Sequence, residues 1–323
     1  MSPQHFAVPA SARSDEEAAT LRQIGLDAPR TAPESAFAHC AATQGALRRL
    51  LLVRAVRSSA AGYVQGMSDL VVPFLQVFLS EAACSGDPSG AEWPQQLDRF
   101  SAPQLALLAA GGGGDAACDA RAAARAAAIA AEDAGLDDAA AGALSPAPRA
   151  GAGAAADVVR AFSDAEADAY WCLCKLLDGI QDFYTFAQPG LQRKVAALAA
   201  LVRRCDPACA AHLEAQGLEY LQFAFRWVNC LLLRELPASL APRLLDAYAA
   251  EGDAFAEFLL YALGAFALSW SADIQARDFQ ELLMFLQAPP SAAWREPDLA
   301  LMLTQAHLLR VQARAERDAA AAA

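Results

Sequence analysis

Two polar side chains near the start of the chain lie in local patterns that suit chemistry. Gln65 lies in the segment Gly62–Leu70, and Arg30 follows a proline in the segment Ile24–Thr31. A carboxamide both donates hydrogen bonds to water and accepts them, so Gln65 could orient a water molecule. A guanidinium is planar, always charged and rich in donors, so Arg30 could neutralise negative charge on a bound group. These two segments are therefore the first candidates for a functional site.

The Gln65 segment lies between two apolar stretches and contains two glycines. Apolar residues recur at helical spacing over residues 47–55, and an apolar run follows from Leu70. Gly62 and Gly66 permit a tight bend or a close approach of two backbones. We therefore expect Gln65 at a corner between two helices, where its carboxamide can project into a groove. A plainer role is also open, in which Gln65 caps the next helix and the neighbouring tyrosine packs, because Gly-x-x-x-Gly spacings are common.

The Arg30 segment is rich in proline. Pro29 and Pro33 restrict the residues before them to extended conformations, so we expect a loop over residues 27–33. Pro29 also fixes the backbone immediately before Arg30, which suits an exposed arginine with a functional role. Taken alone, however, Arg30 would more often be an ordinary solvated surface charge.

The rest of the chain predicts an all-α fold. Hydrophobic residues make up 56% of the 323 residues and charged residues 19%, which is typical of a protein with a large core. No segment shows sustained period-two alternation, so no sheet is expected. Glu166 follows Ser163 at the spacing of a capping box, which predicts a helix start there. The other predicted helices cover residues 40–57, about 70–84, 191–204, 218–233, 243–249, 254–270, 274–287 and 298–315.

Two segments differ in composition from the predicted helical core. Residues 1–18 are polar and mixed, so we expect a mobile N-terminal tail. Residues 98–156 are rich in alanine and glycine and have few large side chains. We interpret them as a low-complexity, mostly disordered insertion within one domain that covers residues 19–323.

Charge and hydropathy argue against binding to nucleic acid and against a membrane-spanning segment. The formal net charge is −12, which argues against broad binding to nucleic acid, because such binding needs a basic surface. The most apolar run, Phe258–Trp270, is too short to span a bilayer and is expected to be a buried helix. The first residues also lack the basic and apolar regions of a signal peptide. We therefore expect neither a nucleic-acid partner nor a transmembrane segment.

The eight cysteines do not predict a disulfide framework or a metal site. The best metal-like cluster is Cys205, Cys209 and His212, which could share a helical face. Pro207 interrupts that cluster, and no fourth ligand lies nearby in the sequence. We expect reduced thiols, as in a cytosolic protein, and no bound metal.

Longer motifs around both candidate segments resemble a known family. The pattern Ile24-x-x-Asp27-x-x-Arg30 followed by Tyr63-x-Gln65 resembles the paired signature of the TBC domain, the GTPase-activating module for Rab proteins. The likeness covers residues 19–97 and 160–312. Segments that look like the TBC domain family member 22 branch are Trp171–Asp182, Tyr184–Gly190 and Tyr220–Trp227.

The chain also departs from the family pattern in two places. Leu245 lies where the family usually has tryptophan, a change that affects packing more than chemistry. The family's domain normally begins with further helices before the arginine motif, and here that part is short. The short start puts stability and activity in doubt, because absent helices would leave apolar surface uncovered.

The resemblance implies a fold and a mechanism. It implies a two-lobed helical domain with a groove that carries two catalytic side chains. Arg30 would be an arginine finger, and Gln65 a glutamine finger that replaces the GTPase's own glutamine in trans. The residues expected to support these fingers or to contact the partner are Ile24, Asp27, Tyr63, Gly66 and Asp69.

The resemblance also implies a partner. The chain would accelerate GTP hydrolysis by a GTP-bound Rab protein in vesicle trafficking, as a regulator that donates catalytic residues and not as an enzyme itself. Magnesium and nucleotide would belong to the GTPase, so we expect no cofactor in this chain. We expect a cytoplasmic protein that visits endomembranes transiently, through the Rab. The alternative is a catalytically inactive Rab-binding scaffold, which the short N-terminus favours and the intact Arg30 and Gln65 disfavour.

Overall fold

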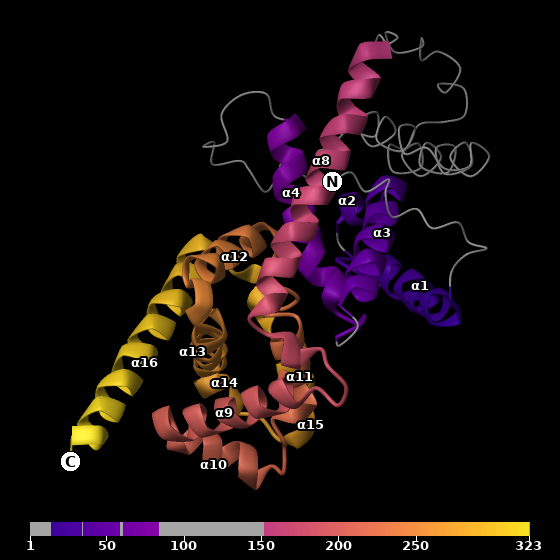
Figure 1. The fold of residues 1–323 in the computed structure, drawn as a ribbon. Coiled ribbons are helices and arrows are strands. Elements are labelled where there is room, and N and C mark those ends of the chain that lie inside the picture. The colour runs from indigo at the N-terminus through magenta and orange to yellow at the C-terminus, as the bar shows by residue number, and fades with distance from the viewer. Residues whose placement is uncertain (1–13, 34, 59–60, 84–151, 323) are drawn as a thin grey trace, which may run out of the picture. The chain divides into compact units, whose positions relative to one another are not determined.

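The structure is a computed structural model that describes residues 14–33, 35–58, 61–83 and 152–322. Over these ranges the chain forms α-helices, short 3-10 helices and connecting turns, and no β-strand (Figure 1). The prediction of an all-α fold is therefore confirmed for the described residues. Within the same ranges, no helix is both long enough and apolar enough to cross a membrane.

The chain divides into two compact units. The first contains the described parts of Met1–Val53 and Phe74–Trp171, and the second contains those of Arg54–Pro73 and Cys172–Ala323. The unit boundaries fall within three continuous helices, α3 (Ala41–Arg57), α4 (Met67–Ala83) and α8 (Ala152–Asp178). Arg30 belongs to the first unit and Gln65 to the second. A groove that carries both residues stays a prediction.

The first unit begins with α1 (Asp15–Asp27), followed by the 3-10 helix η3 (Ala28–Arg30) and the short α2 (Ala36–His39). Ser14 and Glu17 form a capping box, in which each side chain accepts a hydrogen bond from the other residue's backbone N–H. Arg49 of α3 binds Glu166 of α8 through two parallel hydrogen bonds, of 2.9 and 2.7 Å. The Glu166 side chain is buried and the Arg49 side chain is half-exposed, so this pair joins the two helices at the edge of the unit's core.

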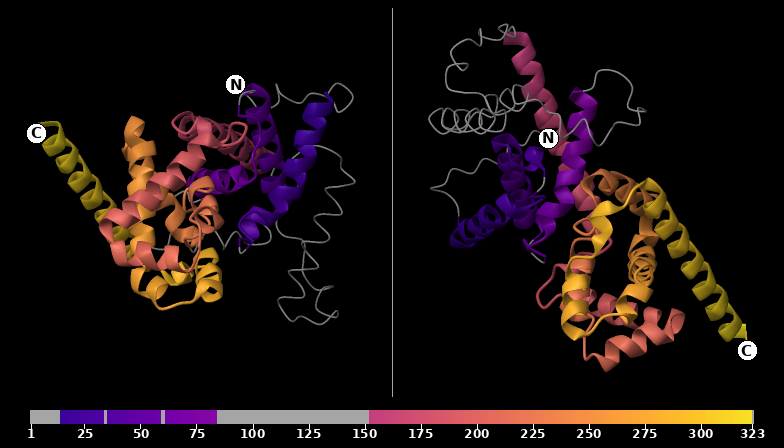
Figure 2. Two further views of the ribbon diagram at one scale, coloured as in Figure 1. Left: turned by 90° about the horizontal axis from the view of Figure 1, so that it is seen from below. Right: turned by 180° about the vertical axis from the view of Figure 1, so that it is seen from behind.

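The second unit is built around α13 (Phe255–Leu268), which is apolar on most faces and buried along most of its length. Helix α13 packs against α9 (Pro189–Cys205), α12 (Ala241–Ala250) and α16 (Glu296–Ala322) (Figures 1 and 2). A helix that is hydrophobic all round belongs in a core, which agrees with this position. The other helices of the unit are η4 (Gln181–Phe183), α10 (Pro207–Ala215), α11 (Leu221–Asn229), η5 (Ala238–Leu240), η6 (Gly252–Ala254), α14 (Ser271–Gln275), α15 (Phe279–Gln287) and η7 (Pro290–Ala293).

Aromatic contacts join α11 to the centre of the second unit. Trp227 meets Phe266 of α13 edge to face, with ring centroids 5.0 Å apart, and Phe266 meets Trp294 at 5.4 Å. Trp270 stacks on Trp294 with centroids 5.6 Å apart. Each such pair adds about 0.5–1.5 kcal/mol beyond the energy of its buried area. The contact between Trp227 and Phe266 therefore stabilises the packing of α11 against α13.

Several predicted boundaries are wrong. The expected tail, residues 1–18, includes the first turn of α1, because the Ser14 capping box starts a helix at Asp15. Residues 152–156 of the expected insertion belong to α8, because alanine is the best helix former. Ser163 therefore lies inside α8 and does not cap a helix. The remainder of both segments, residues 1–13 and 98–151, lies outside the described residues.

Two further differences concern the elements around the candidate site. The loop expected over residues 27–33 begins with the 3-10 turn η3, because proline is tolerated in the first turn of a helix. The helix expected over residues 218–233 is shorter: α11 ends at Asn229, and Leu231 and Leu232 adopt positive φ values of 52° and 64°. This left-handed pair reverses the chain directly after α11.

Candidate functional site

Arg30 lies at the end of η3 and is held by its own turn. Its side chain is 63% exposed. The Nε atom donates a hydrogen bond of 3.1 Å to the carbonyl oxygen of Leu26, and a terminal nitrogen forms an ion pair with the carboxylate of Asp27. Two nitrogens of the guanidinium are therefore held against the end of α1, while the side chain as a whole stays largely exposed to solvent.

The support beneath Arg30 is buried. Asp27 is 4% exposed, and its carboxylate also accepts a hydrogen bond of 3.0 Å from Nε2 of Gln23. Ile24, one helical turn earlier, is fully buried in the core of the first unit. Gln44 of α3 donates from Nε2 to the carbonyl of Ala28 at 3.0 Å, which fixes the turn from the other side. An exposed cation is thus presented on a backbone that buried side chains hold in place.

Gln65 lies at the corner between α3 and α4, and its side chain is exposed. The corner needs two left-handed backbone positions, at Gly62 with φ 58° and at Gly66 with φ 101°. Asn229 donates a hydrogen bond of 2.7 Å from Nδ2 to the carbonyl oxygen of Gln65. A Cβ atom on Gly66 would lie 2.4 Å from that Nδ2 and 3.1 Å from Sγ of Cys230, so only glycine fits against this support.

The end of α11 is held in turn by further side chains. The hydroxyl of Tyr184 donates a hydrogen bond of 2.8 Å to the carbonyl oxygen of Asn229. Burial, with a smaller contribution from Cys230, raises the pKa of Tyr184 well above its usual value, so the hydroxyl stays protonated and available as a donor. Arg226 binds Glu235 through two hydrogen bonds of 2.7 Å, which closes the turn after α11. The backbone that supports Gln65 is therefore fixed on both sides.

Asp69 and Tyr63 complete the corner. The backbone N–H of Asp69 donates to the carbonyl of Gly66 at 3.1 Å, in the turn that starts α4. Its carboxylate accepts a long hydrogen bond, 3.9 Å, from Sγ of Cys230, and lies 3.9 Å from Nε of Arg234. Burial and the nearby Asp69 carboxylate raise the pKa of the Cys230 thiol, so Cys230 is an inert packing residue. Tyr63 is half-buried at the same corner.

The structure thus groups the predicted site residues in two clusters. Ile24, Asp27 and Arg30 lie together in the first unit. The cluster in the second unit consists of Tyr63, Gln65, Gly66 and Asp69.

Sequence reasoning missed Asn229 and the hydroxyl of Tyr184. One signal for Asn229 was present: it is the polar residue in the apolar run that starts at Trp227 and continues to Leu233. A buried amide in such a run normally has a hydrogen-bonding task. Which backbone it binds depends on a contact across 164 residues, which local patterns do not reveal.

No metal centre accompanies the site within the described ranges. There, no group of three or more His, Cys, Asp or Glu side chains is arranged to hold a metal ion. The cluster considered from the sequence is split, since Cys205 is exposed and Cys209 is buried. His212 is engaged elsewhere, with Nε2 2.9 Å from the carbonyl oxygen of Arg277.

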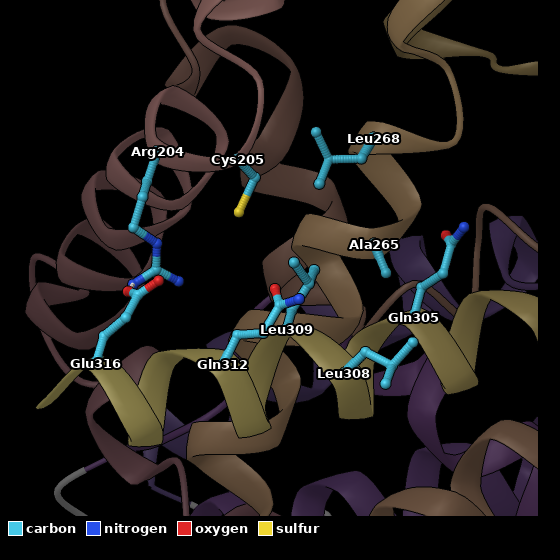
Figure 3. Close-up of a pocket in the computed structure, with 9 residues that line it drawn as sticks. All are labelled: Arg204, Cys205, Ala265, Leu268, Gln305, Leu308, Leu309, Gln312 and Glu316. Atoms are coloured by element: carbon cyan, nitrogen blue, oxygen red, sulfur yellow. Dashed lines mark ion pairs between the residues drawn. The ribbon is translucent and has the colours of Figure 1, made fainter. Parts of the chain in front are cut away.

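A pocket of about 410 Å³ lies in the second unit (Figure 3). Its lining comes from the end of α9, from α13 and from α16. Arg204 and Glu316 form an ion pair of 3.2 Å across one end, and Leu308 and Leu309 supply apolar surface. None of the predicted site residues lines it.

Comparisons with known proteins agree with the resemblance of the motifs. The family model described as Rab-GTPase-TBC domain matches residues 9–85 and 150–274. GTPase-activating protein gyp1 of Schizosaccharomyces pombe is 40% identical over 288 residues, which cover 89% of this chain and 44% of that protein. TBC1 domain family member 22A of Mus musculus is 38% identical over 302 residues, covering 93% of this chain and 46% of that protein.

A solved structure shares the fold. The crystal structure of the Ypt/Rab-GAP domain of Gyp1p superposes with a TM-score of 0.70 at 31% sequence identity, covering 94% of this chain and 76% of that one. The chain spans less than half the length of the two relatives named above. The residues matched by the family model include both candidate clusters and the whole of α11. Its sequence and its fold therefore make this chain a member of the Rab-GTPase-TBC domain family.

Proposed function

We propose that this chain is a GTPase-activating protein for a Rab-family GTPase and that it supplies two catalytic side chains in trans. The observation that carries the proposal is shared by both clusters: an exposed polar residue is held by a buried polar side chain. The carboxylate of Asp27 is paired with the guanidinium of Arg30, and Asn229 donates a hydrogen bond to the backbone carbonyl of Gln65. Such fixed, solvent-facing groups are what a partner's reaction needs, because catalysis depends on groups that are positioned before the substrate arrives.

Arg30 acts on the phosphoryl group. GTP hydrolysis develops negative charge on the transferring phosphoryl group, and an arginine supplied by a partner stabilises it. In the free chain the guanidinium is paired with Asp27 and the carbonyl of Leu26, so these contacts must loosen when the phosphate is engaged. Asp27 is a positioning residue in this scheme, and Ile24 anchors its helix in the core.

Gln65 acts on the attacking water. Its carboxamide can accept a hydrogen bond from the water and donate one to the phosphate, which is the task of the glutamine that many GTPases carry themselves. The fixed carbonyl of Gln65 limits the directions in which its side chain can point. Tyr63, Gly66 and Asp69 shape the corner that carries Gln65, and the half-buried Tyr63 would contact the partner there.

The partner carries the remaining parts of the catalytic centre. Nucleotide and Mg²⁺ belong to the GTP-bound Rab, so this chain acts as a regulator that completes another protein's active site. The chain would work in the cytoplasm and meet endomembranes through the Rab.

The test is single-turnover phosphate release from a panel of GTP-loaded Rab proteins. The proposal expects the 323-residue chain to accelerate release from at least one Rab, and to do so at catalytic concentration. A chain that binds Rab proteins without accelerating any of them would be a scaffold, and the proposal would be wrong.

A further inference from the structure

Three large apolar side chains of the second unit are exposed near the support of Gln65. Phe186 is 98% exposed, Leu221 is 46% exposed and Phe225 is 40% exposed. We call these three residues the Phe186 surface. A phenylalanine that leaves almost its whole ring in water forgoes roughly 1.5–3 kcal/mol of burial energy, so its position calls for an explanation.

The loop that carries Phe186 is tied down on both sides. Phe183 and Tyr184 before it are buried, and the hydroxyl of Tyr184 binds the carbonyl of Asn229. After it, Gln188 donates from Nε2 to the carbonyl of Phe183 at 2.9 Å. Phe186 therefore lies exposed to solvent on a loop whose two sides are fixed by hydrogen bonds.

The same loop stores backbone strain. Ala187 and Gln188 both have positive φ, 60° and 47°, although neither is glycine. Each such residue costs of order 1–3 kcal/mol, and residues of this kind cluster at ligand clamps and binding sites. Backbone strain at Ala187 and Gln188 thus lies next to the exposed ring of Phe186. This combination is typical of a loop that is preorganised to contact a binding partner.

The Phe186 surface is connected to the Gln65 corner through the buried Asn229. Leu221, Phe225 and Asn229 follow one another at intervals of four on α11, so they share one side of that helix. At 1.5 Å per residue, Phe225 lies about 6 Å and Leu221 about 12 Å along the axis from Asn229. Phe186 is two residues from Tyr184, which binds Asn229 directly, and two residues span at most about 7 Å.

A partner that engages Gln65 would cover this surface. A standard interface buries about 800 Å² on each protein, which as a disc has a radius of roughly 16 Å. Asn229 is hydrogen-bonded both to the backbone of Gln65 and to the hydroxyl of Tyr184, so an interface of this size, roughly 32 Å across, is wide enough to reach from Gln65 to the three apolar residues. Rigid aromatic anchors at such positions commonly dominate binding energy.

We propose that Phe186, with Leu221 and Phe225, is a docking surface for an apolar patch on the GTPase that receives Gln65. The inference rests on the proposed function for the identity of the partner. Phe186 supplies affinity and Gln65 supplies chemistry, so the two contributions separate in experiment.

The test measures binding and turnover separately. The Rab that responds best to the 323-residue chain is loaded with a non-hydrolysable GTP analogue, and its Kd is measured by titration for wild type, F186S and F225S. Leu301 on α16, 61% exposed, gives the matched control L301S. All three variants remove exposed apolar area, so folding is expected to survive, which circular dichroism checks.

The proposal expects F186S to raise Kd by about tenfold or more, the effect of losing a hot-spot aromatic, and F225S to raise it by a smaller factor. L301S should leave Kd within about twofold of wild type, as expected for a surface residue outside the interface. An F186S value equal to that of L301S would overturn the docking surface. So would a wild-type dimer that F186S dissociates while the Kd for the Rab is unchanged, since the surface would then bind a second copy.

These outcomes are distinct from failure of the proposed function. That failure would appear as Arg30→Ala and Gln65→Ala variants that keep full turnover at saturating Rab, whatever their Kd. Weak binding by F186S together with undiminished turnover by both finger variants would leave the docking surface intact and remove the two-finger mechanism.

Discussion

At the scale of single residues, the candidate site depends on buried polar groups that fix exposed ones. Asn229 illustrates this arrangement: Nδ2 binds the carbonyl of Gln65, while its buried Oδ1 has no hydrogen-bond partner among the described residues. A buried acceptor without a partner costs about 1–3 kcal/mol. The residue that binds the backbone of Gln65 therefore lowers the stability of the fold locally.

The first prediction follows from that contact. Replacing Asn229 by alanine frees the carbonyl of Gln65, and a misplaced catalytic group typically costs about a hundredfold in rate. Single-turnover phosphate release should fall by about as much for Asn229→Ala as for Gln65→Ala. The double variant should fall no further than either single one, because both act through the same carboxamide. Additive losses in the double variant would show that Asn229 acts independently of Gln65.

The second prediction compares the two glycines of the corner. Gly66→Ala places a Cβ atom 2.4 Å from Nδ2 of Asn229, whereas Gly62→Ala meets nothing within 4 Å. Both positions are left-handed, so both substitutions carry a conformational cost of about 1–2 kcal/mol. Thermal unfolding should show a larger drop in Tm for Gly66→Ala, and only this variant should lose GTPase stimulation through displacement of Asn229. Equal Tm shifts would mean that the corner has room to move.

At the scale of elements, the end of α11 is the part that brings distant segments to Gln65. Arg226 and Glu235 close the turn after this helix, and Arg226 also donates to the carbonyl of Gln287 at the end of α15. Burial raises the pKa of Glu235 despite the opposing effect of Arg226, while hydrogen bonding to Glu235 raises the pKa of Arg226. The pair therefore sets the geometry of the turn in a partly dry environment.

The third prediction removes one member of that pair. Arg226→Met removes the cation that hydrogen-bonds to the buried Glu235, a change that costs about 1–3 kcal/mol or more. The folded-state pKa of Glu235 then lies further above the unfolded value of 4.5, so the folded state binds more protons than the unfolded state above about pH 4.5. Stability of the variant should fall as pH rises from 4.5, as measured by urea unfolding at several pH values. A free energy of unfolding that is independent of pH would contradict this.

The elements also show which features the sequence could predict. The helical class followed from the lack of period-two alternation, and the motifs located Arg30 and Gln65 at exposed positions. Boundaries failed where a single cap decided them, as at Ser14, or where left-handed residues without glycine ended a helix, as at Leu231 and Leu232. The support of Gln65 by Asn229 could not be predicted, because it joins segments far apart in the chain and depends on the reversal after α11.

At the scale of the whole molecule, the two candidate clusters belong to different units. Arg30 and its support lie in the first unit, and Gln65 and its support lie in the second. Family membership rests on most of the chain, since the match to the Gyp1p domain covers 94% of its residues. The two-finger mechanism requires one GTPase to contact both clusters at once, and this requirement is the central claim.

The most direct measurement of that claim is single-turnover phosphate release with a responsive Rab, for wild type, Arg30→Ala, Arg30→Lys and Gln65→Ala. Arginine fingers supplied in trans contribute about 10³–10⁵-fold, so Arg30→Ala should reduce stimulation by at least about a hundredfold. Arg30→Lys should stimulate phosphate release little better than Arg30→Ala, because an ammonium group lacks the planar fork of donors of a guanidinium. Gln65→Ala should also impair stimulation, since no carboxamide from this chain would then orient the water.

The decisive comparison adds a Rab whose own catalytic glutamine is replaced by alanine. If Gln65 acts in trans, this change in the Rab should matter much less than Gln65→Ala in the chain, with circular dichroism confirming that each variant is folded. The opposite ranking would show an arginine-only mechanism. Folded Arg30→Ala and Gln65→Ala variants that both stimulate hydrolysis as well as wild type would contradict the assignment of both fingers.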